Sequence, residues 1–132
     1  MYRPRAIVSL APNPYPFAYQ AYLQDWQQWA EWGILDELVV QVYRDNLTSF
    51  SQELDSPIIT NIRSKIPAAI GILTGLRIKS IPIELIREKV KLTRDKGFHG
   101  FAYFFYESLG DRDEDFQELH PHATQRPQRQ PS

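Results

Sequence analysis

Several common features are absent from this sequence of 132 residues. It contains no cysteine, which excludes disulfide bonds and thiolate metal sites. Its 15 basic and 16 acidic side chains give a formal net charge of −1, so we expect neither a nucleic-acid partner nor attraction to an anionic membrane surface. No apolar run approaches the roughly 20 residues that a membrane-spanning helix needs. The composition therefore predicts one soluble globular domain.

Signals for export and for phosphate binding are also missing. The N-terminus, MYRPRAIVSLAPNP, has too short an apolar stretch and too many prolines for a signal peptide, so we expect a cytoplasmic chain by default. The segment GILTGL contains Gly71 and Gly75 but matches neither glycine-rich phosphate loop. His120 and His122 have no partner ligands nearby in the sequence. We therefore expect no nucleotide cofactor and no metal.

Strand-like segments are present in a regular pattern. Four apolar runs recur at intervals of roughly 30 residues, which is the size of a βαβ unit. They are Ala6–Leu10, Leu38–Tyr43, Pro67–Leu73 and Gly100–Tyr106. Runs that are apolar on both faces indicate a parallel sheet. The pattern predicts an α/β fold.

Helical patterns lie between these runs. One extends from Tyr19 to Trp32 and is followed by Gly33, a residue typical of helix ends. Another begins near Ser80 and ends before Gly97. The segment 46–65 is expected to form two pieces, because Pro57 interrupts it.

Two architectures fit this alternation. One is a small open α/β sheet, and the other is a piece of a (β/α)₈ barrel with four βα units and helices on one face. We expect the folded part to end near residue 109. Residues 110–132 have few apolar side chains, three prolines and many charges, and they predict a disordered tail.

Polar side chains gather where each predicted strand ends. In the run LVVQVYRD, residues 38–45, the alternation places Val39, Gln41 and Tyr43 on one face of the strand. Ligands of parallel α/β folds bind at the carboxyl ends of the strands, so we expect a shared pocket there. The polar or irregular residues at these four ends are Ser9, Asn13, Gln41, Tyr43, Arg44, Asp45, Thr74, Gly75, Leu76, Arg77, Tyr106, Glu107 and Ser108.

Glu107 is the strongest candidate among them for a functional residue. It follows the apolar run FAYFFY, where burying a carboxylate without a partner is costly. We therefore expect it to reach solvent or to meet a ligand or an arginine. The alternative to a functional role is an ion pair with Arg77 or Arg44.

Other candidates have structural alternatives as well. Gln41 can equally well satisfy a local backbone group. Asp45, followed by Asn46 and Thr48, is expected to cap the next helix rather than to act in catalysis.

Aromatic side chains suggest stacking surfaces for a ligand. Trp26, Trp29 and Trp32 have helical spacing, and core packing against the sheet explains them better than sugar stacking. Tyr15 lies in the loop after the first strand and is better placed to stack on a ligand.

Four segments together resemble the C-terminal part of the glycosyl-hydrolase-like family 10 domain of bacteria. They are LAPNPYPFAYQAYLQDWQQW, ELVVQVYRDNLTSF, IPAAIGILTGLR and GFHGFAYFFYESL, and the resemblance runs from about Ile7 to Leu109. It implies a (β/α)₈ barrel related to glycoside hydrolases. Members of this family usually work outside the cytoplasm, and characterised relatives are thought to cleave bacterial cell-wall glycan strands. On this mapping the chain supplies the last four βα units, as a half-barrel.

The resemblance also implies an incomplete active site. The family's acidic motif, Asp-Gly-x-x-x-Asp-Asp, follows the fourth barrel strand and is not found in this sequence. Glycoside hydrolysis usually needs two carboxyl groups, about 5–5.5 Å apart for retention or about 6.5–9.5 Å apart for inversion. Glu107 and Asp45 remain as candidate catalytic carboxylates at the rim.

The resemblance gives the other rim residues roles in binding a glycan. Asn13 and Gln41 would donate or accept hydrogen bonds with sugar hydroxyls, and Tyr15 or Tyr43 would stack on a ring. The remaining expected binding residues are Arg44, Thr74 and Arg77. The sugar, its linkage and the choice between retention and inversion remain open.

Four parallel strands do not close a barrel of eight, which leaves two strand edges and the inner face uncovered. The expected inward layer includes Val39, Leu73, Tyr103 and Phe105. Three outcomes are open: a homodimer, a complex with a complementing N-terminal half, or a remnant of marginal stability. Two functions remain as hypotheses, a glycan-binding module derived from a hydrolase and a non-catalytic module that self-associates through its strand edges.

Overall fold

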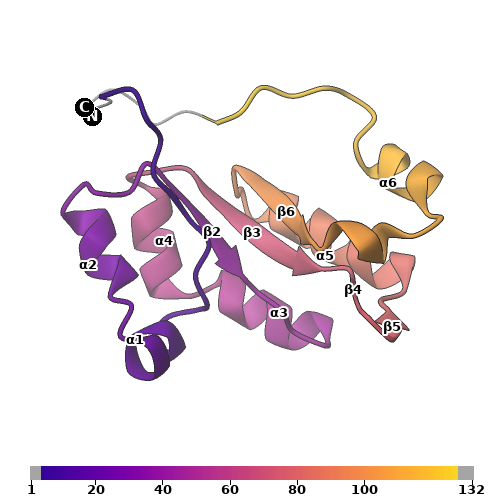
Figure 1. Cartoon of the computed structure of the whole chain (residues 1–132), viewed down its shortest axis with the longest axis horizontal. Helices are drawn as coiled ribbons and strands as arrows, with labels where there is room; N and C mark the ends of the chain where they lie inside the picture. Colours follow the sequence, from indigo (N-terminus) through magenta and orange to yellow (C-terminus); the bar gives the residue numbers. More distant parts are fainter. Residues whose placement is uncertain (1–3, 128–132) are drawn as a thin grey trace.

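The computed structural model describes residues 4–127. Helices and strands alternate along most of the chain, as Figure 1 shows. The strands are β1 (Ser9–Leu10), β2 (Glu37–Gln41), β3 (Ala68–Leu73), β4 (Gly75–Leu76), β5 (Lys79–Ser80) and β6 (Gly100–Phe104). The helices are α1 (Phe17–Tyr22), α2 (Trp26–Glu31), α3 (Leu47–Leu54), α4 (Pro57–Arg63), α5 (Ile83–Asp95), the 3₁₀ helix η1 (Tyr106–Leu109) and α6 (Asp113–Leu119).

The main sheet is parallel and has four strands in the order β1-β2-β3-β6. The intervening helices connect these strands in sequence, which confirms the predicted α/β class and is consistent with part of a TIM barrel. Strands β4 and β5 form a separate antiparallel hairpin directly after β3. This hairpin was not anticipated from the sequence.

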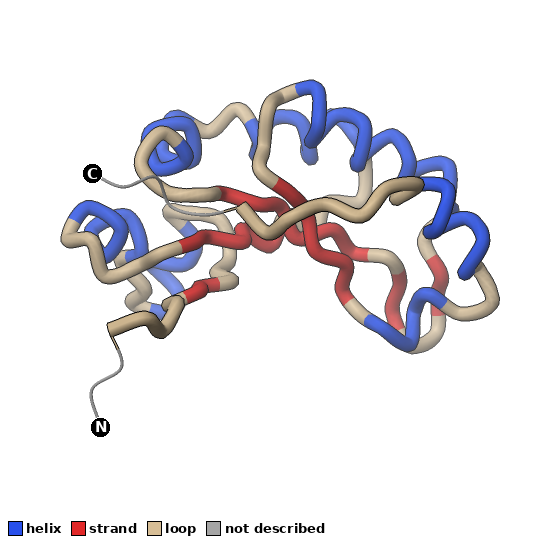
Figure 2. Tube along the Cα trace, turned by 90° about the horizontal axis from the view of Figure 1, so that it is seen from above, coloured by secondary structure: helices blue, strands red, loops and turns tan. Residues whose placement is uncertain are grey.

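The two faces of the sheet differ in burial. Leu38, Val40 and Ile70 are fully buried on the face that packs against the helices. Val39 and Phe104 lie on the opposite face and are half-buried and exposed respectively. Figure 2 shows most of the helices along one side of the curved sheet. We call the side of the sheet without helices the open face.

Local sequence signals set several helix ends. Pro57 occupies the first turn of α4, and α3 ends just before it, so the expected break in segment 46–65 is confirmed. Gly33 has a φ of 73°, as its place after a helix predicted. The single helix expected over 19–32 is instead two helices. Leu23 adopts a left-handed φ of 56° after α1, and Asp25 accepts a hydrogen bond from the Gln28 N–H to begin α2.

One expectation about the inner layer is wrong. Tyr103 pairs with Ile72 in the parallel register, and Ile72 is fully buried on the helix side. Tyr103 therefore faces the helices, where its ring meets Phe116 of α6 edge-on at 5.0 Å. Val39 and Leu73 do lie on the open face.

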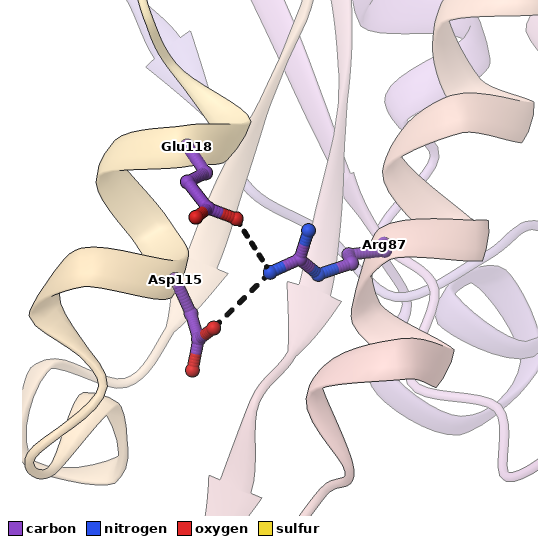
Figure 3. A network of polar contacts seen from close by, with 3 residues as sticks. All are labelled: Arg87, Asp115 and Glu118. Atoms are coloured by element: carbon purple, nitrogen blue, oxygen red, sulfur yellow. Dashed lines mark hydrogen bonds and ion pairs between the residues drawn. The ribbon is translucent and has the colours of Figure 1, made fainter.

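The expectation of disorder from residue 110 is wrong for residues 113–119, which form α6. Phe116 and Leu119 are buried against the core. The Arg87 guanidinium of α5 donates to Asp115 at 3.1 Å and to Glu118 at 2.9 Å, so one cation joins two carboxylates of α6 (Figure 3). Apolar burial and this network hold α6 on α5.

Beyond α6, residues 120–127 run back across the amino ends of the strands (Figures 1 and 2). Arg126 forms two hydrogen bonds with the Glu37 carboxylate at the start of β2, at 2.6 and 3.1 Å. His120 Nε2 lies 2.8 Å from the Tyr103 hydroxyl. Both ends of this segment are thus tied to the sheet.

Candidate functional site

The carboxyl edge of the sheet carries an aromatic pair on the open face. Tyr43, just after β2, stacks on Phe104 at the end of β6, with ring centroids 5.5 Å apart and planes inclined by 27°. Between them lies Gly71 of β3, where an added Cβ would be 3.6 Å from Tyr43 Cε1. Burial raises the pKa of the Tyr43 hydroxyl. The pair forms a half-buried aromatic surface at the edge where ligands of parallel sheets bind.

Gln41, the last residue of β2, lies two positions before Tyr43 and is held by the protein itself. Its side-chain Nε2 donates to the carbonyl oxygen of Ala11 at 2.6 Å, and its backbone N–H donates to Pro12 O at 2.9 Å. Gln41 therefore has the structural role that was the alternative to ligand binding, since its amide fixes the loop after β1. Within residues 4–127 its side-chain oxygen accepts no hydrogen bond, so one polar atom is left for a ligand.

Asn13 and Tyr15 belong to the same loop after β1. The Asn13 carbonyl accepts a hydrogen bond from Trp26 Nε1 at 3.1 Å. Tyr15 meets the fully buried Trp26 edge-on at 5.4 Å and lies 5.6 Å from Tyr19. Partial burial raises the pKa of Tyr15, and the Asp25 charge adds to this. Tyr15 thus serves core packing, and Trp26 is a core residue as predicted.

Arg44 and Asp45 follow β2. Arg44 donates to Glu53 of α3 at 2.5 Å, so it does not pair with Glu107. Asp45 is exposed, and the cap of α3 is Asn46, whose Oδ1 accepts from the Ser49 N–H at 2.8 Å.

A buried lysine supports this loop. Lys89 of α5 is 1% exposed, and its Nζ donates to the Arg44 carbonyl at 2.6 Å. Its ammonium also lies 5.4 Å from the centre of the Phe50 ring. Burial lowers the pKa of Lys89, and the Asp45 charge opposes this. Lys89 was not predicted from the sequence, although its spacing from Ile86 and Val90 places it on the apolar face of α5.

Thr74 and Ser108 join the loops after β3 and β6. The Thr74 hydroxyl donates to the Phe104 carbonyl at 3.0 Å and lies 2.5 Å from Ser108 Oγ. Arg112 donates to the carbonyl oxygens of Thr74, Ile81 and Ser108. Thr74 is fully buried, so its hydroxyl is committed to this linkage.

Arg77 and Glu107 lie farther out on this rim. Arg77 is exposed in the turn between β4 and β5, beside Ile78, which is 98% exposed. Glu107 lies exposed in η1, and it forms no ion pair within the described part of the chain. The ion pair considered for Glu107 with Arg77 or Arg44 is therefore not formed.

The structure thus pairs Tyr43 with Phe104, commits the Gln41 amide to the loop after β1, and leaves Glu107 and Asp45 exposed in the loops that follow β6 and β2. Over residues 4–127 there is no group of three acidic, histidine or cysteine side chains that would hold a metal ion. In the same range no helix has the length and apolar character to cross a membrane.

This parallel sheet, with helices on one face and an aromatic pair at its carboxyl edge, is an α/β module consistent with part of a TIM barrel. Comparison with family models identifies it further. The chain belongs to the glycosyl hydrolase-like 10 family, whose model matches residues 1–92. This match covers β1 to β3 and most of α5, whereas Phe104 and Glu107 follow it. Neither curated proteins nor solved structures gave a match.

Proposed function

We propose that this protein is a glycan-binding module of glycoside-hydrolase type, which holds a sugar ring on the Tyr43–Phe104 pair. The stacked pair at the carboxyl edge is the observation that carries the proposal. Apolar faces of sugar rings pack on aromatic rings, while their hydroxyls need hydrogen-bond partners. In this proposal the side-chain oxygen of Gln41, which accepts no hydrogen bond within residues 4–127, serves as one such partner.

The glycan is proposed to be a bacterial cell-wall polysaccharide. Family membership supports a carbohydrate substrate. In this proposal Asn13 and Arg44 border the sugar, and Arg77 reaches it from the β4–β5 hairpin. Tyr15 and Thr74 act indirectly, because packing and the loop linkage already engage them.

Hydrolysis requires two carboxyl groups on either side of the glycosidic bond. Glu107 is proposed as the acid/base or the positioning carboxylate of this rim, because it is exposed and forms no ion pair among residues 4–127. Asp45 is the second candidate. A complementing half that covers the open face would bring further groups to the same edge.

The test is binding of soluble cell-wall glycan fragments, measured by isothermal titration calorimetry. Replacing Phe104 by Ala should weaken binding about fivefold, since an aromatic contact contributes about 1 kcal/mol. Trp32→Ala is the matched control, because Trp32 is an exposed aromatic residue at the end of α2, away from this edge. Equal affinities of the two variants would overturn the role of the pair.

Glu107→Gln separates binding from catalysis. If Glu107 acts as proposed, this variant loses any hydrolysis that the chain shows with a complementing half and keeps its glycan affinity within a few-fold. Unchanged hydrolysis would remove Glu107 from the mechanism.

A second candidate function is self-association without catalysis. The open face, where Val39, Leu73, Ala102 and Phe104 are only partly covered, favours it. Light scattering distinguishes the two candidates. A mass of twice 15.4 kDa that persists without glycan supports a homodimer across this face, whereas a stable monomer contradicts it.

A further inference from the structure

Residues 120–127 form one wall of an open cavity at the amino end of the sheet, opposite the proposed glycan site. Its volume is about 680 Å³, which is within the usual range for small-molecule sites. The cavity lies between this segment, the end of α5 and the start of β6. Its side chains that bear charge or imidazole are Arg94, His99, His120, His122 and Arg126.

The charge of this lining is one-sided. Within the described residues no carboxylate lines the cavity. Glu37 neutralises Arg126 through two hydrogen bonds. Among residues 4–127 Arg94 has no carboxylate partner: its Nη2 donates to the Leu119 carbonyl at 2.6 Å, and its guanidinium lies 5.2 Å from the centre of the Phe101 ring. Within the described residues, therefore, no carboxylate offsets the guanidinium of Arg94 at the cavity wall.

The imidazoles add donors to this wall. His99 Nδ1 accepts a hydrogen bond from the Ala68 N–H at 3.1 Å, so the neutral ring carries its proton on Nε2. The His120 ring lies 5.1 Å from that of Phe101 and is fixed by the Tyr103 hydroxyl. Cationic and N–H donor groups thus lie around the Phe101 ring in this cavity.

We propose that this cavity binds a small molecule through a phosphate or carboxylate group, with Arg94 as its main partner. A guanidinium presents a planar set of donors that matches both oxyanions. The His99 Nε2–H supplies a second donor, and Phe101 supplies an apolar surface for the rest of the molecule. This site is independent of the proposed glycan site, and its failure would leave that proposal unaffected.

The test follows the imidazole signals of the full chain by NMR during titration with three probes. These are inorganic phosphate, glucuronate as a carboxylate on a sugar, and glucose as a neutral control. A saturable shift of the His99 and His120 signals with phosphate or glucuronate, but not with glucose, is expected. A shift with phosphate alone, or with glucuronate alone, would show which of the two oxyanions the cavity binds.

Arg94→Gln should weaken this binding about tenfold or more, as expected for loss of a charged hydrogen-bond donor. Arg94→Lys keeps the charge and should recover part of the affinity. Lys91→Gln is the matched control, because Lys91 lies on the same helix, pairs with Asp95 and does not line the cavity. The proposal would be overturned if neither anion gave a saturable shift. It would also be overturned if Arg94→Gln, with an unchanged unfolding temperature, bound the anions as tightly as wild type.

Discussion

Lys89 Nζ lies 2.6 Å from the carbonyl oxygen of Arg44, so a buried ammonium group ties α5 to the loop after β2. Substituting Lys89 by Met keeps the apolar stem but leaves this carbonyl without its partner. We expect the free energy of unfolding to fall by about 1–3 kcal/mol at neutral pH. Urea unfolding measures this change, and Lys91→Met, an exposed cation on the same helix, should have little effect.

The same substitution should change how stability depends on pH. Burial lowers the folded-state pKa of Lys89 below its ordinary value of 10.5. Between these two pKa values the unfolded chain binds more protons, so the contribution of Lys89 to stability rises with pH and is lost as pH falls through the folded pKa. The difference between wild type and Lys89→Met should therefore widen as pH rises toward 10.5. A constant difference would contradict this role.

Gly71 is required for the close approach of β2 and β3. A Cβ at this position would lie 3.3 Å from both Gln41 Cα and Val40 O, which are backbone atoms with little freedom to move. Gly71→Ala should destabilise the fold by about 1–3 kcal/mol through overpacking. Gly100→Ala is the matched control on β6, because its Cβ would meet only Ala69 Cβ at 3.9 Å. Equal unfolding midpoints for the two variants would refute the argument.

Tyr103 should titrate at unusually high pH. Burial raises the pKa of its hydroxyl to about 12. Because the folded pKa exceeds the ordinary value of about 10, the stability that Tyr103 contributes is complete below pH 10 and is lost as pH rises toward 12. Ultraviolet difference titration of wild type and Tyr103→Phe should show one late tyrosinate step that the variant lacks. A variant that instead lacks a step near pH 10 would show that Tyr103 is not buried as described.

Arg126 should hold residues 120–127 on the sheet in a pH-dependent way. Its hydrogen bonds lower the pKa of Glu37 below 4.5, so the stabilisation is present above that pH and is lost as pH falls through the lowered pKa. Arg126 is more than half exposed, so Arg126→Ala should cost less than about 1 kcal/mol globally. Limited digestion with proteinase K should cut segment 120–127 faster in the variant than in wild type, while β3 stays intact. Equal rates of cutting in 120–127 would mean that the ion pair does not anchor the segment.

Local chemistry allowed much of the fold to be predicted from the sequence. Pro57 and Gly33 act through their own backbone, so the ends of α3 and of α2 could be located without tertiary information. The repeat of apolar runs predicted the parallel sheet because strands that are apolar on both faces are typical of such sheets. Helix α6 was missed because its stability comes from Phe116 and Leu119 packing on distant elements, which composition alone does not reveal.

The candidate site was only partly predictable. The run GFAYFFY is apolar at every position, so its alternation does not show which residues face the helices, and Tyr103 was assigned to the wrong face. Gln41 and Tyr43 were found because a polar side chain in a buried strand is unusual. The partners of Gln41 and Thr74 lie about 30 positions away in the chain, and only the fold brings them together.

The linkage between Thr74, Ser108 and Arg112 has a mechanical consequence for the rim. Arg112 donates to carbonyl groups of the loops after β3 and β6 and of the segment leading into α5. These hydrogen bonds tie the three loops to one another, so we expect the loops to shift together when a ligand binds. Altering the specificity of this rim is therefore expected to need substitutions that keep Arg112 and these three carbonyl partners in place.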